Sequence, residues 1–511
     1  MTPAAAHASP SKADPIAPAA GGAASALAGA GLTDAPVVRR AIDALVQEVG
    51  TRSARLSDAR PPRGELGESY DALLKRAADT RGRALLYPYL GTGVGNGALV
   101  ELADGSVKWD MVCGIGVHFF GHSEPGLVRA ALEAGLSDIL QHGNLQANFE
   151  AYAFAEKLLA HAGRQSRLKH AYLTTSGVMA NENALKVCYQ KTGGAAPRVL
   201  AFQDCFMGRT VTMSQIGDSA ANRIGLPLNT LVDYVPFYDA VLAEADGPQA
   251  AIDRSVMALR QHLDRYPKQH ACFVFELVQG EGGFNTAPRE FFTALMGLCR
   301  ERGVIIWDDE IQTFGRLESM FAFELLGLGD WVDIVTIGKM TQACATLYTE
   351  DLNPGPGLLS GTFTSTSAAY RVGLHVLDRL ASGAYYGPKG LIARNFAAFA
   401  RQVRALASKH PEWFPPVDPP GAPDIVGGAG GMMRFTPFAG RKDRIMKACK
   451  HLFDEGVITF YAGHGPYHVR MLPPLGVFRE EDWPKVFACV ERGLARAAAE
   501  IGPTDRAPGQ N

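Results

Sequence analysis

The sequence has none of the features that mark a membrane protein, a nucleic-acid-binding protein or a disulfide-rich secreted domain. Its 511 residues contain no run near the roughly 18 apolar residues that a membrane-spanning helix needs. The formal net charge of −2 provides no strong field to attract nucleic acid or an anionic membrane. The eight cysteines form no CxxC pair, and the thirteen histidines show no ligand spacing such as HExxH. These absences predict a cytoplasmic protein of small-molecule chemistry, without a metal site and without nucleic-acid or membrane partners.

The N-terminal segment has almost no basic residues and no compact apolar run. Residues 1–36 are rich in alanine, proline and glycine, and Lys12 is the only lysine or arginine before Arg39. This composition is typical of a disordered extension rather than a signal or transit peptide. Because single cores stop growing near about 250 to 300 residues, the rest of the chain predicts more than one domain. We assign residues 37–109 to an N-terminal arm and part of a small domain, 110–380 to a large domain, 381–501 to the C-terminal small domain and 502–511 to a tail.

Helical stretches alternate with short apolar runs through the predicted large domain. The helical stretches include 180–190 and 290–302, and the apolar runs are 199–202, 272–277, 304–307 and 334–337. This alternation is typical of an α/β fold in which helices cover both faces of a parallel sheet. Two later runs, 432–435 and 467–471, follow a glycine-rich turn and predict a small antiparallel sheet. The glycine-rich stretch 91–97 leads into a strand, so we interpret it as a turn rather than a nucleotide-binding loop.

Two of the predicted strands end in ionisable residues. One apolar run leads into Asp309, and another leads into Lys339. Ligands of open parallel sheets bind at the carboxyl ends of strands, so both side chains are expected to face one crevice. A carboxylate and a lysine amine of lowered pKa can serve opposite ends of a cofactor that has a pyridine nitrogen and an aldehyde. Taken singly, each residue is more typical of a solvated surface position, and the pairing weakens that alternative without removing it.

A small polar loop runs directly into a predicted helix at residues 174–186. Ser176 precedes the first turn, and Gly177 and Val178 begin the helix. The free N–H groups of such a helix start, together with its dipole, suit a phosphate. Simple capping of the helix by Ser176 explains the same pattern, so the loop alone leaves both interpretations open.

These segments resemble, in order and spacing, the class III aminotransferases of fold type I over residues 87–490. Residues 309–313 resemble the strand-end acid motif of that family, and residues 275–283 resemble its EPxQGEGG motif. Further similarities lie in residues 114–117, 206–210, 361–363 and 470–475. The resemblance implies a large domain with a mostly parallel seven-stranded sheet, a smaller α+β domain, and pyridoxal 5′-phosphate as the cofactor. It also implies a homodimer with active sites at the interface.

The resemblance assigns a cofactor-binding role to eight residues. Lys339 would carry the cofactor as a Schiff base and then act as general acid and base, and Asp309 would pair with the pyridinium nitrogen. Gln312 would hydrogen-bond the phenolic oxygen, and Phe206 would stack on the ring. Ser176, Gly177 and Val178 would bind the phosphate, and Thr362 would bind the phosphate of the neighbouring subunit.

Three further residues would bind the substrate by the same resemblance. Arg470 resembles the clamp for an α-carboxylate, Arg209 the residue for a distal carboxylate, and Glu281 the acid that pairs with the clamp when an ω-amino substrate is bound. The implied reaction moves an amino group from a donor such as 4-aminobutyrate, lysine or ornithine to 2-oxoglutarate or pyruvate by a ping-pong mechanism. A decarboxylase or aminomutase on the same scaffold, or a catalytically silent protein that binds pyridoxal phosphate, is the alternative.

The sequence also departs from the family pattern. Leu277 stands where proline is usual, and Met207 where histidine is frequent. Residues 340–346 lack the glycine-rich run of acetylornithine and ornithine enzymes, which favours the branch of 4-aminobutyrate and lysine ε-aminotransferases. Ser176 and Met179 occupy the positions of the cysteines that hold an iron–sulfur cluster in some relatives, so no cluster is expected. Residues 361–366 lack the usual Gly-Gly-Asn-Pro continuation, which predicts a different pocket near the phosphate.

Overall fold

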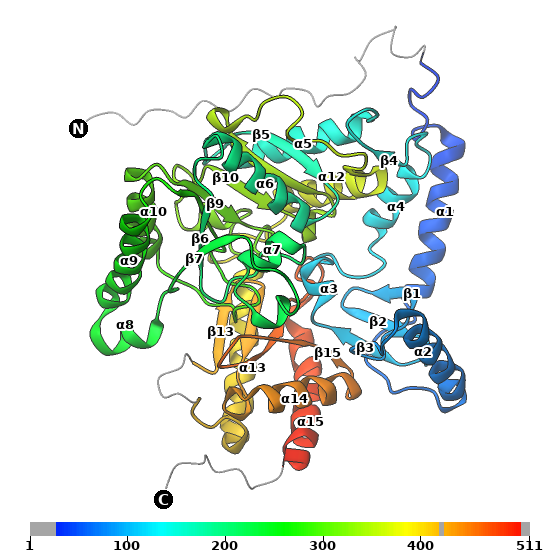
Figure 1. Cartoon of the computed structure of the whole chain (residues 1–511). Coiled ribbons are helices and arrows are strands. Elements are labelled where there is room, and N and C mark those ends of the chain that lie inside the picture. The colour runs from blue at the N-terminus through cyan, green and yellow to red at the C-terminus, as the bar shows by residue number, and fades with distance from the viewer. Residues whose placement is uncertain (1–26, 418–423, 502–511) are drawn as a thin grey trace, which may run out of the picture.

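The structure is a computed structural model that describes residues 27–417 and 424–501 (Figure 1). Most of the predicted extension and the whole predicted tail lie outside the described residues. From Leu27 the chain forms turns that lead into the first helix, α1 (Pro36–Ser53). The helices that follow up to the main sheet are α2 (Gly67–Arg81), α3 (Cys113–Gly116), α4 (Pro125–Ala134) and α5 (Phe149–Ala162).

A seven-stranded sheet forms the centre of the molecule, with the strand order β5-β11-β10-β9-β8-β6-β7. All neighbours are parallel except β11, which runs antiparallel to both β5 and β10. Strands β8 to β11 are buried along their whole length, as expected for a sheet covered on both faces. The strands are β5 (Leu168–Thr174), β6 (Arg198–Phe202), β7 (Leu231–Val235), β8 (His270–Phe275), β9 (Ile305–Asp309), β10 (Ile334–Ile337) and β11 (Cys344–Thr349).

Amphipathic helices cover this sheet (Figure 1). Helix α10 shows the pattern clearly, because Phe291, Phe292, Leu295 and Cys299 recur at helical spacing and are all buried. Helix α6 packs on β10 and β11 and carries the polar loop at its start. The helices in this part are α6 (Gly177–Lys191), α7 (Val211–Ile216), α8 (Ala240–Asp246), α9 (Pro248–Arg265), α10 (Arg289–Glu301), α11 (Ala322–Leu325) and α12 (Ser367–Ser382).

The C-terminal part contains a second, antiparallel sheet with the order β13-β14-β17-β16. Its strands are β13 (Val426–Ala429), β14 (Met432–Phe435), β16 (Phe460–Ala462) and β17 (His468–Met471), and its helices are α13 (Leu391–Lys409), α14 (Lys442–Asp454) and α15 (Trp483–Ile501). The glycine-rich stretch 427–431, expected as a turn, instead begins within β13 and turns only after Ala429. A Cβ atom on Gly427 would lie 2.3 Å from the guanidinium carbon of the buried Arg434, so a larger residue there would require the Arg434 side chain to shift.

The N-terminal region joins the C-terminal region through a third sheet. Strands β1 (Gly91–Asn96), β2 (Leu99–Leu102) and β3 (Val107–Asp110) form an antiparallel meander, and the late strand β15 (Val457–Ile458) pairs in parallel with β3. The interpretation of residues 91–97 as a turn was therefore wrong for most of the stretch, which is a strand. Only Gly97, with φ near +58°, makes the turn. The two-stranded sheet of β4 (Gln141–His142) and β12 (Ser365–Thr366) completes the strands of the described residues.

The largest cluster of buried apolar side chains runs from Leu56 to Ala497 and connects these parts, and two smaller clusters are separate from it. All eight cysteines are buried free thiols. Within the described ranges, no helix is long and apolar enough to cross a membrane. In the same ranges, no group of three or more histidine, cysteine, aspartate or glutamate side chains is arranged to hold a metal ion.

Candidate active site

The two ionisable strand ends meet at one edge of the central sheet. Strands β9 and β10 are parallel neighbours, with Thr336 aligned to Asp309, and Lys339 follows three residues later. Lys339 begins a short 3₁₀ turn with φ near +52°, a left-handed conformation that is uncommon outside glycine. Burial lowers the pKa of Lys339 to about 8, although the charges of Glu281 and Asp309 act in the opposite direction. The structure thus brings an amine with an increased neutral fraction beside a carboxylate.

The Asp309 carboxylate is held by two donors. Its Oδ1 accepts from the Ile311 amide at 2.9 Å, and its Oδ2 accepts from Asn181 Nδ2 at 2.8 Å. Asn181 lies on α6 and also donates to the Met207 carbonyl at 2.8 Å. Burial raises the pKa of Asp309 to about 6, while both donors and Lys339 lower it. A cation placed against the free edge of this carboxylate would keep it ionised.

Glu276 is a site residue that the sequence analysis did not identify. It is buried at the end of β8 and accepts from the Phe206 amide at 3.1 Å and from the Gly280 amide at 2.8 Å. Burial raises its pKa to about 8, and the neighbouring Asp309 charge adds to this effect. Glu276 therefore joins the loop of Phe206 to the loop of Gly280 beneath the reacting groups.

Arg470 and Glu281 form a contact beside the lysine. Arg470 is fully buried on β17, and its Nη1 lies 2.7 Å from Glu281 Oε1. Burial opposes ionisation of Glu281, but Arg470 prevails and holds its pKa below the ordinary value. The Phe460 ring lies 5.0 Å from the Arg470 guanidinium carbon, on the paired strand β16. In the described part of the chain, Arg470 Nε and Nη2 have no hydrogen-bond partner, so two donors are available to a ligand.

The start of α6 forms a tight backbone cradle. Ser176 caps the helix, and its Oγ accepts from the Met179 amide at 3.4 Å. A Cβ atom on Gly177 would come within 2.8 Å of Ile311, and one on Gly208 within 2.3 Å of Val178. The first amides of a helix have no intrahelical acceptor, so this cradle is suited to an anion.

The structure places Gln312 inside the site and Thr362 at the surface. Gln312 is buried beside Gly280, and its Oε1 has no partner among the described residues. Thr362 lies exposed on the segment before β12, where the Gly361 carbonyl accepts from the Asn144 amide at 3.2 Å. No hydrogen bond links Thr362 to the other predicted site residues within the described ranges. The chain therefore brings ten of the eleven predicted residues to one region and leaves Thr362 on the surface.

A cavity of about 310 Å³ opens beside this region. Its lining includes Phe206, Arg209 and Glu281, and it extends to Lys442 at the start of α14 and to Tyr467 before β17. We call it the outer cavity. Because Glu281 belongs both to its lining and to the contact with Arg470, the outer cavity leads outward from the reacting groups.

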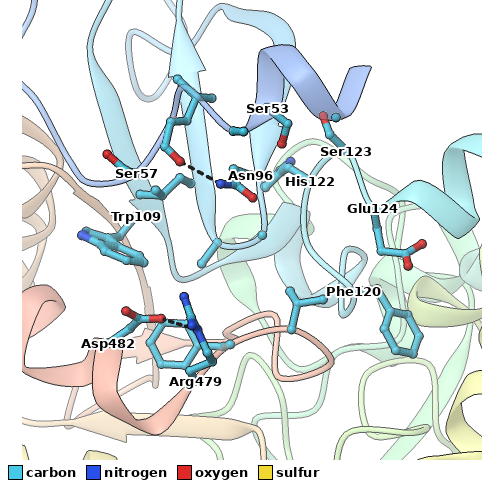
Figure 2. A pocket seen from close by; sticks show the side chains of 18 of the residues that line it. Ser53, Ser57, Asn96, Trp109, Phe120, His122, Ser123, Glu124, Arg479 and Asp482 are labelled. Atoms are coloured by element: carbon cyan, nitrogen blue, oxygen red, sulfur yellow. Dashed lines mark hydrogen bonds and ion pairs between the residues drawn. The ribbon is translucent and has the colours of Figure 1, made fainter. Parts of the chain in front are cut away.

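A larger cavity of about 520 Å³ lies elsewhere, among α1, the β1–β2 hairpin and residues 477–485 (Figure 2). Its polar side chains are largely engaged with the protein. His122 Nε2 lies 2.9 Å from Asp110 Oδ2, and Asn96 Nδ2 donates to the Leu56 carbonyl at 2.8 Å. The Asn96 contact lies within the N-terminal arm and the His122 contact lies within residues 110–122, so both polar groups are already bonded within the protein.

A comparison with known families identifies the chain. The family model for class-III aminotransferases matches residues 89–492. The protein belongs to the class III aminotransferase family. This aminotransferase is 28% identical to the 4-aminobutyrate aminotransferase of Mycobacterium bovis over 445 residues, 80% of the chain and 92% of that protein. It is 30% identical to the mitochondrial acetylornithine aminotransferase of Eremothecium gossypii over 315 residues, 59% of the chain and 70% of that protein.

Solved structures show the same fold. The aminotransferase superposes on the lysine aminotransferase of M. tuberculosis with a TM-score of 0.71 at 21% identity, over 83% of the chain and all of that chain. The ornithine aminotransferase of Toxoplasma gondii gives a TM-score of 0.68 at 19% identity, over 86% of the chain and all of that chain. The predictions of a fold-type I architecture, of a pyridoxal-phosphate-dependent enzyme and of aminotransferase membership are thereby confirmed. Small-molecule amino donors and oxo acids are the substrates of this family.

The residues in the site fit pyridoxal phosphate. The group carries an aldehyde, a pyridine nitrogen, a phenolic oxygen and a phosphate, and the site offers a counterpart for each. Lys339 supplies an amine, Asp309 a carboxylate and Gln312 a side-chain amide without a partner for its oxygen. The glycine-lined start of α6 supplies the anion cradle.

Proposed function

We propose that this aminotransferase transfers an amino group from an ω-amino donor, such as 4-aminobutyrate, lysine or ornithine, to 2-oxoglutarate or pyruvate by a ping-pong mechanism. The contact between Glu281 and Arg470 carries the proposal, because it places a removable carboxylate on a guanidinium that has two further free donors. The relatives named as 4-aminobutyrate and acetylornithine aminotransferases support the same donor class. We place the enzyme in the cytoplasm as a homodimer.

Pyridoxal phosphate, when bound, supplies an aldehyde that takes up the amino group and a ring that withdraws electrons from the reacting carbon. Lys339 would hold the cofactor through its amine, and the same amine, when free, would remove and return the proton at the substrate carbon. Asp309 would keep the ring nitrogen protonated, and the Asn181 amide fixes the orientation of this carboxylate. Gln312 would bind the phenolic oxygen, and Phe206 would lie against the ring.

The phosphate would be held at the start of α6 and at the subunit interface. Ser176, Gly177 and Val178, at the start of α6, would hold the phosphate from within one subunit, and Thr362 would hold the phosphate of the other. The exposed position of Thr362 supports this arrangement. Two large apolar side chains lie exposed on adjoining segments, Leu145 at 98% and Phe363 at 60%, and a partner subunit would cover them.

The amino donor and the 2-oxo acid use the Arg470 clamp in turn. An ω-amino donor has no carboxylate at the reacting carbon, so Glu281 remains on Arg470 and balances its charge. A 2-oxo acid brings an α-carboxylate that replaces Glu281 and bonds Arg470 through a bidentate contact. Arg209, at the outer cavity, binds the distal carboxylate of those substrates that carry one, such as 4-aminobutyrate and 2-oxoglutarate, whereas pyruvate has none.

A donor screen tests the proposal. The holoenzyme is mixed with each candidate donor alone, and loss of the visible absorbance of the bound cofactor reports amino transfer. Addition of pyruvate or 2-oxoglutarate should restore that absorbance and release the amino acid. Release of carbon dioxide or isomerisation of the donor without net transfer would instead establish the decarboxylase or aminomutase alternative. Failure of borohydride to attach the cofactor to Lys339 would establish the alternative of a catalytically silent protein that binds pyridoxal phosphate.

The assignment of Arg209 has its own test in the same assay. Arg209→Ala should slow the half-reaction of 4-aminobutyrate, which carries a distal carboxylate. An unchanged 4-aminobutyrate half-reaction in this variant would show that the distal carboxylate binds elsewhere.

A further inference from the structure

The outer cavity contains two cationic side chains that have no acidic partner. Arg209 Nη1 donates to the neutral Asn222 amide oxygen at 2.6 Å, and its guanidinium carbon lies 5.6 Å from the Phe206 ring centre. Lys442 Nζ lies 5.3 Å from the Tyr467 ring centre. Among the described residues, no carboxylate lies within ion-pair distance of either cation. Each is instead held over an aromatic ring, which keeps it directed along the cavity wall.

The other charges around the outer cavity are already balanced. Its only lining carboxylate is that of Glu281, which is engaged by Arg470 at 2.7 Å. His464 also lines the cavity, near Asp204, whose pKa is raised because burial outweighs the opposing charge of His464. The lining therefore has a net positive charge that comes from Arg209 and Lys442. The N-terminal end of α14, which begins at Lys442, adds a partial positive charge to the same wall.

We propose that Lys442 acts with Arg209 as a second anion-binding position, which receives the distal carboxylate of a dicarboxylic amino or 2-oxo acid longer than 2-oxoglutarate. This inference rests on the proposed function and deepens it. The outer cavity, at about 310 Å³, reaches the lower end of the volumes typical of ligand pockets, which begin at about 300 Å³. Its aromatic walls, from Phe206, Tyr461 and Tyr467, suit the methylene chain that separates the two carboxylates.

The larger cavity of Figure 2 does not offer an equivalent position. Its lining cations are paired within the protein, Arg479 with Glu481 at 3.8 Å and with Asp482 at 3.6 Å, and Lys485 with Asp482 at 3.2 Å. The contrast shows why an anionic ligand would be drawn to the outer cavity and not to the larger one. An isolated pair of cations with no acid beside it is the arrangement that attracts a charged substrate group.

Binding of unreactive dicarboxylates to the holoenzyme tests Lys442 without turnover. Calorimetric titration gives the Kd of glutarate, adipate and pimelate, with butyrate as the monocarboxylate. Lys442→Met should raise the Kd of adipate and pimelate about fivefold, leave butyrate unchanged, and weaken the dependence of binding on sodium chloride. Lys442→Arg should retain the affinity. Lys450→Met is the matched control, since Lys450 is exposed on the same helix but does not line the cavity.

Several results would overturn the inference. They are an unchanged Kd for every dicarboxylate in Lys442→Met, an equal loss for butyrate, and an equal loss in Lys450→Met. Tighter binding of inorganic phosphate than of adipate, with the same dependence on Lys442, would also overturn the assignment of a carboxylate.

Half-reactions then separate donor from acceptor. A specific effect of Lys442→Met on 2-aminoadipate would place the long dicarboxylate on the donor side, and a specific effect on 2-oxoadipate would place it on the acceptor side. Amino transfer that proceeds normally while Lys442→Met has no effect on any dicarboxylate would defeat this inference alone. Lys442-dependent binding without amino transfer from any donor would defeat the proposed function alone.

Discussion

At the scale of the residue, the environment of Lys339 determines when its amine can react with an aldehyde. Its pKa is lowered to about 8 because burial disfavours the charged form. The protonated amine is not a nucleophile, so attachment of pyridoxal phosphate to the apoenzyme should be slow below pH 8. The rate should rise through a midpoint near 8 and then level, whereas an ordinary lysine would give a midpoint near 10.5. Stopped-flow absorbance between pH 6.5 and 10.5 measures this profile.

The control for the Lys339 profile is Lys339→Ala, which should give no borohydride-stable attachment at any pH. A midpoint above 10 in the unsubstituted enzyme would contradict the lowered pKa.

Sequence patterns predicted the ionisable groups of the site better than the residues that orient them. Asp309 and Lys339 could be predicted because each ends a strand, and strand ends of a parallel sheet share an edge. Asn181 and Glu276 were not identified, because their importance comes from contacts across the fold. Asn181 lies 128 positions from Asp309, and Glu276 lies 70 positions from Phe206, to which it is hydrogen-bonded. No periodicity within a segment predicts such contacts.

At the scale of the element, the start of α6 depends on a glycine from another loop. Gly208 has φ near +125°, and a Cβ atom there would lie 2.3 Å from Val178. Gly208→Ala should therefore displace the first turn of α6 and cost about 1–3 kcal/mol of stability. It should also weaken binding of pyridoxal phosphate by tenfold or more, at roughly 1.4 kcal/mol per factor of ten. Thermal unfolding and absorbance titration of the apoenzyme measure the two effects.

Gly193→Ala provides the matched control for this contact. Gly193 follows the other end of α6 with φ near +59°, and a Cβ atom there would meet nothing within 4 Å. This variant should lose some stability from backbone strain but keep its cofactor affinity. Equal cofactor affinity in both variants would show that the approach of Gly208 to Val178 does not shape the phosphate site.

Strands could be predicted from the sequence where their side chains are apolar, but not where glycines take the place of those side chains. The apolar runs 199–202 and 334–337 correspond to β6 and β10, because fully buried strands are continuously apolar. Residues 91–96 have little β propensity, yet they form β1. Glycine stands in this strand because the chain passes close to its neighbours, and a Cβ atom on Gly95 would lie 2.4 Å from the His122 side chain. This requirement for glycine conceals the strand from a pattern of side chains.

At the scale of the whole molecule, the outer cavity and the exposed Thr362 lay beyond prediction for different reasons. The outer cavity is bounded by segments near residues 206, 281, 442 and 467, which only the complete fold brings together. Thr362 was assigned by resemblance, and within one chain it has no contact that explains the assignment. Its proposed role depends on a second copy of the chain, so a test of the quaternary structure is also a test of the active site.

The exposed apolar side chains around Thr362 allow the proposed dimer to be tested. Leu145 and Phe363 lie on two segments that meet where the Asn144 amide donates to the Gly361 carbonyl, and burial of exposed apolar side chains favours association. Sedimentation velocity of the unsubstituted enzyme at micromolar concentration should give a dimer. Phe363→Asp should shift it toward monomer and weaken cofactor binding, because Thr362 would then be withdrawn from the partner's phosphate.

The control is Met257→Asp, at another exposed apolar residue, on α9, which should change neither the oligomeric state nor cofactor binding. A fully active monomer would show that one chain completes its own phosphate site, and that Thr362 has no part in it.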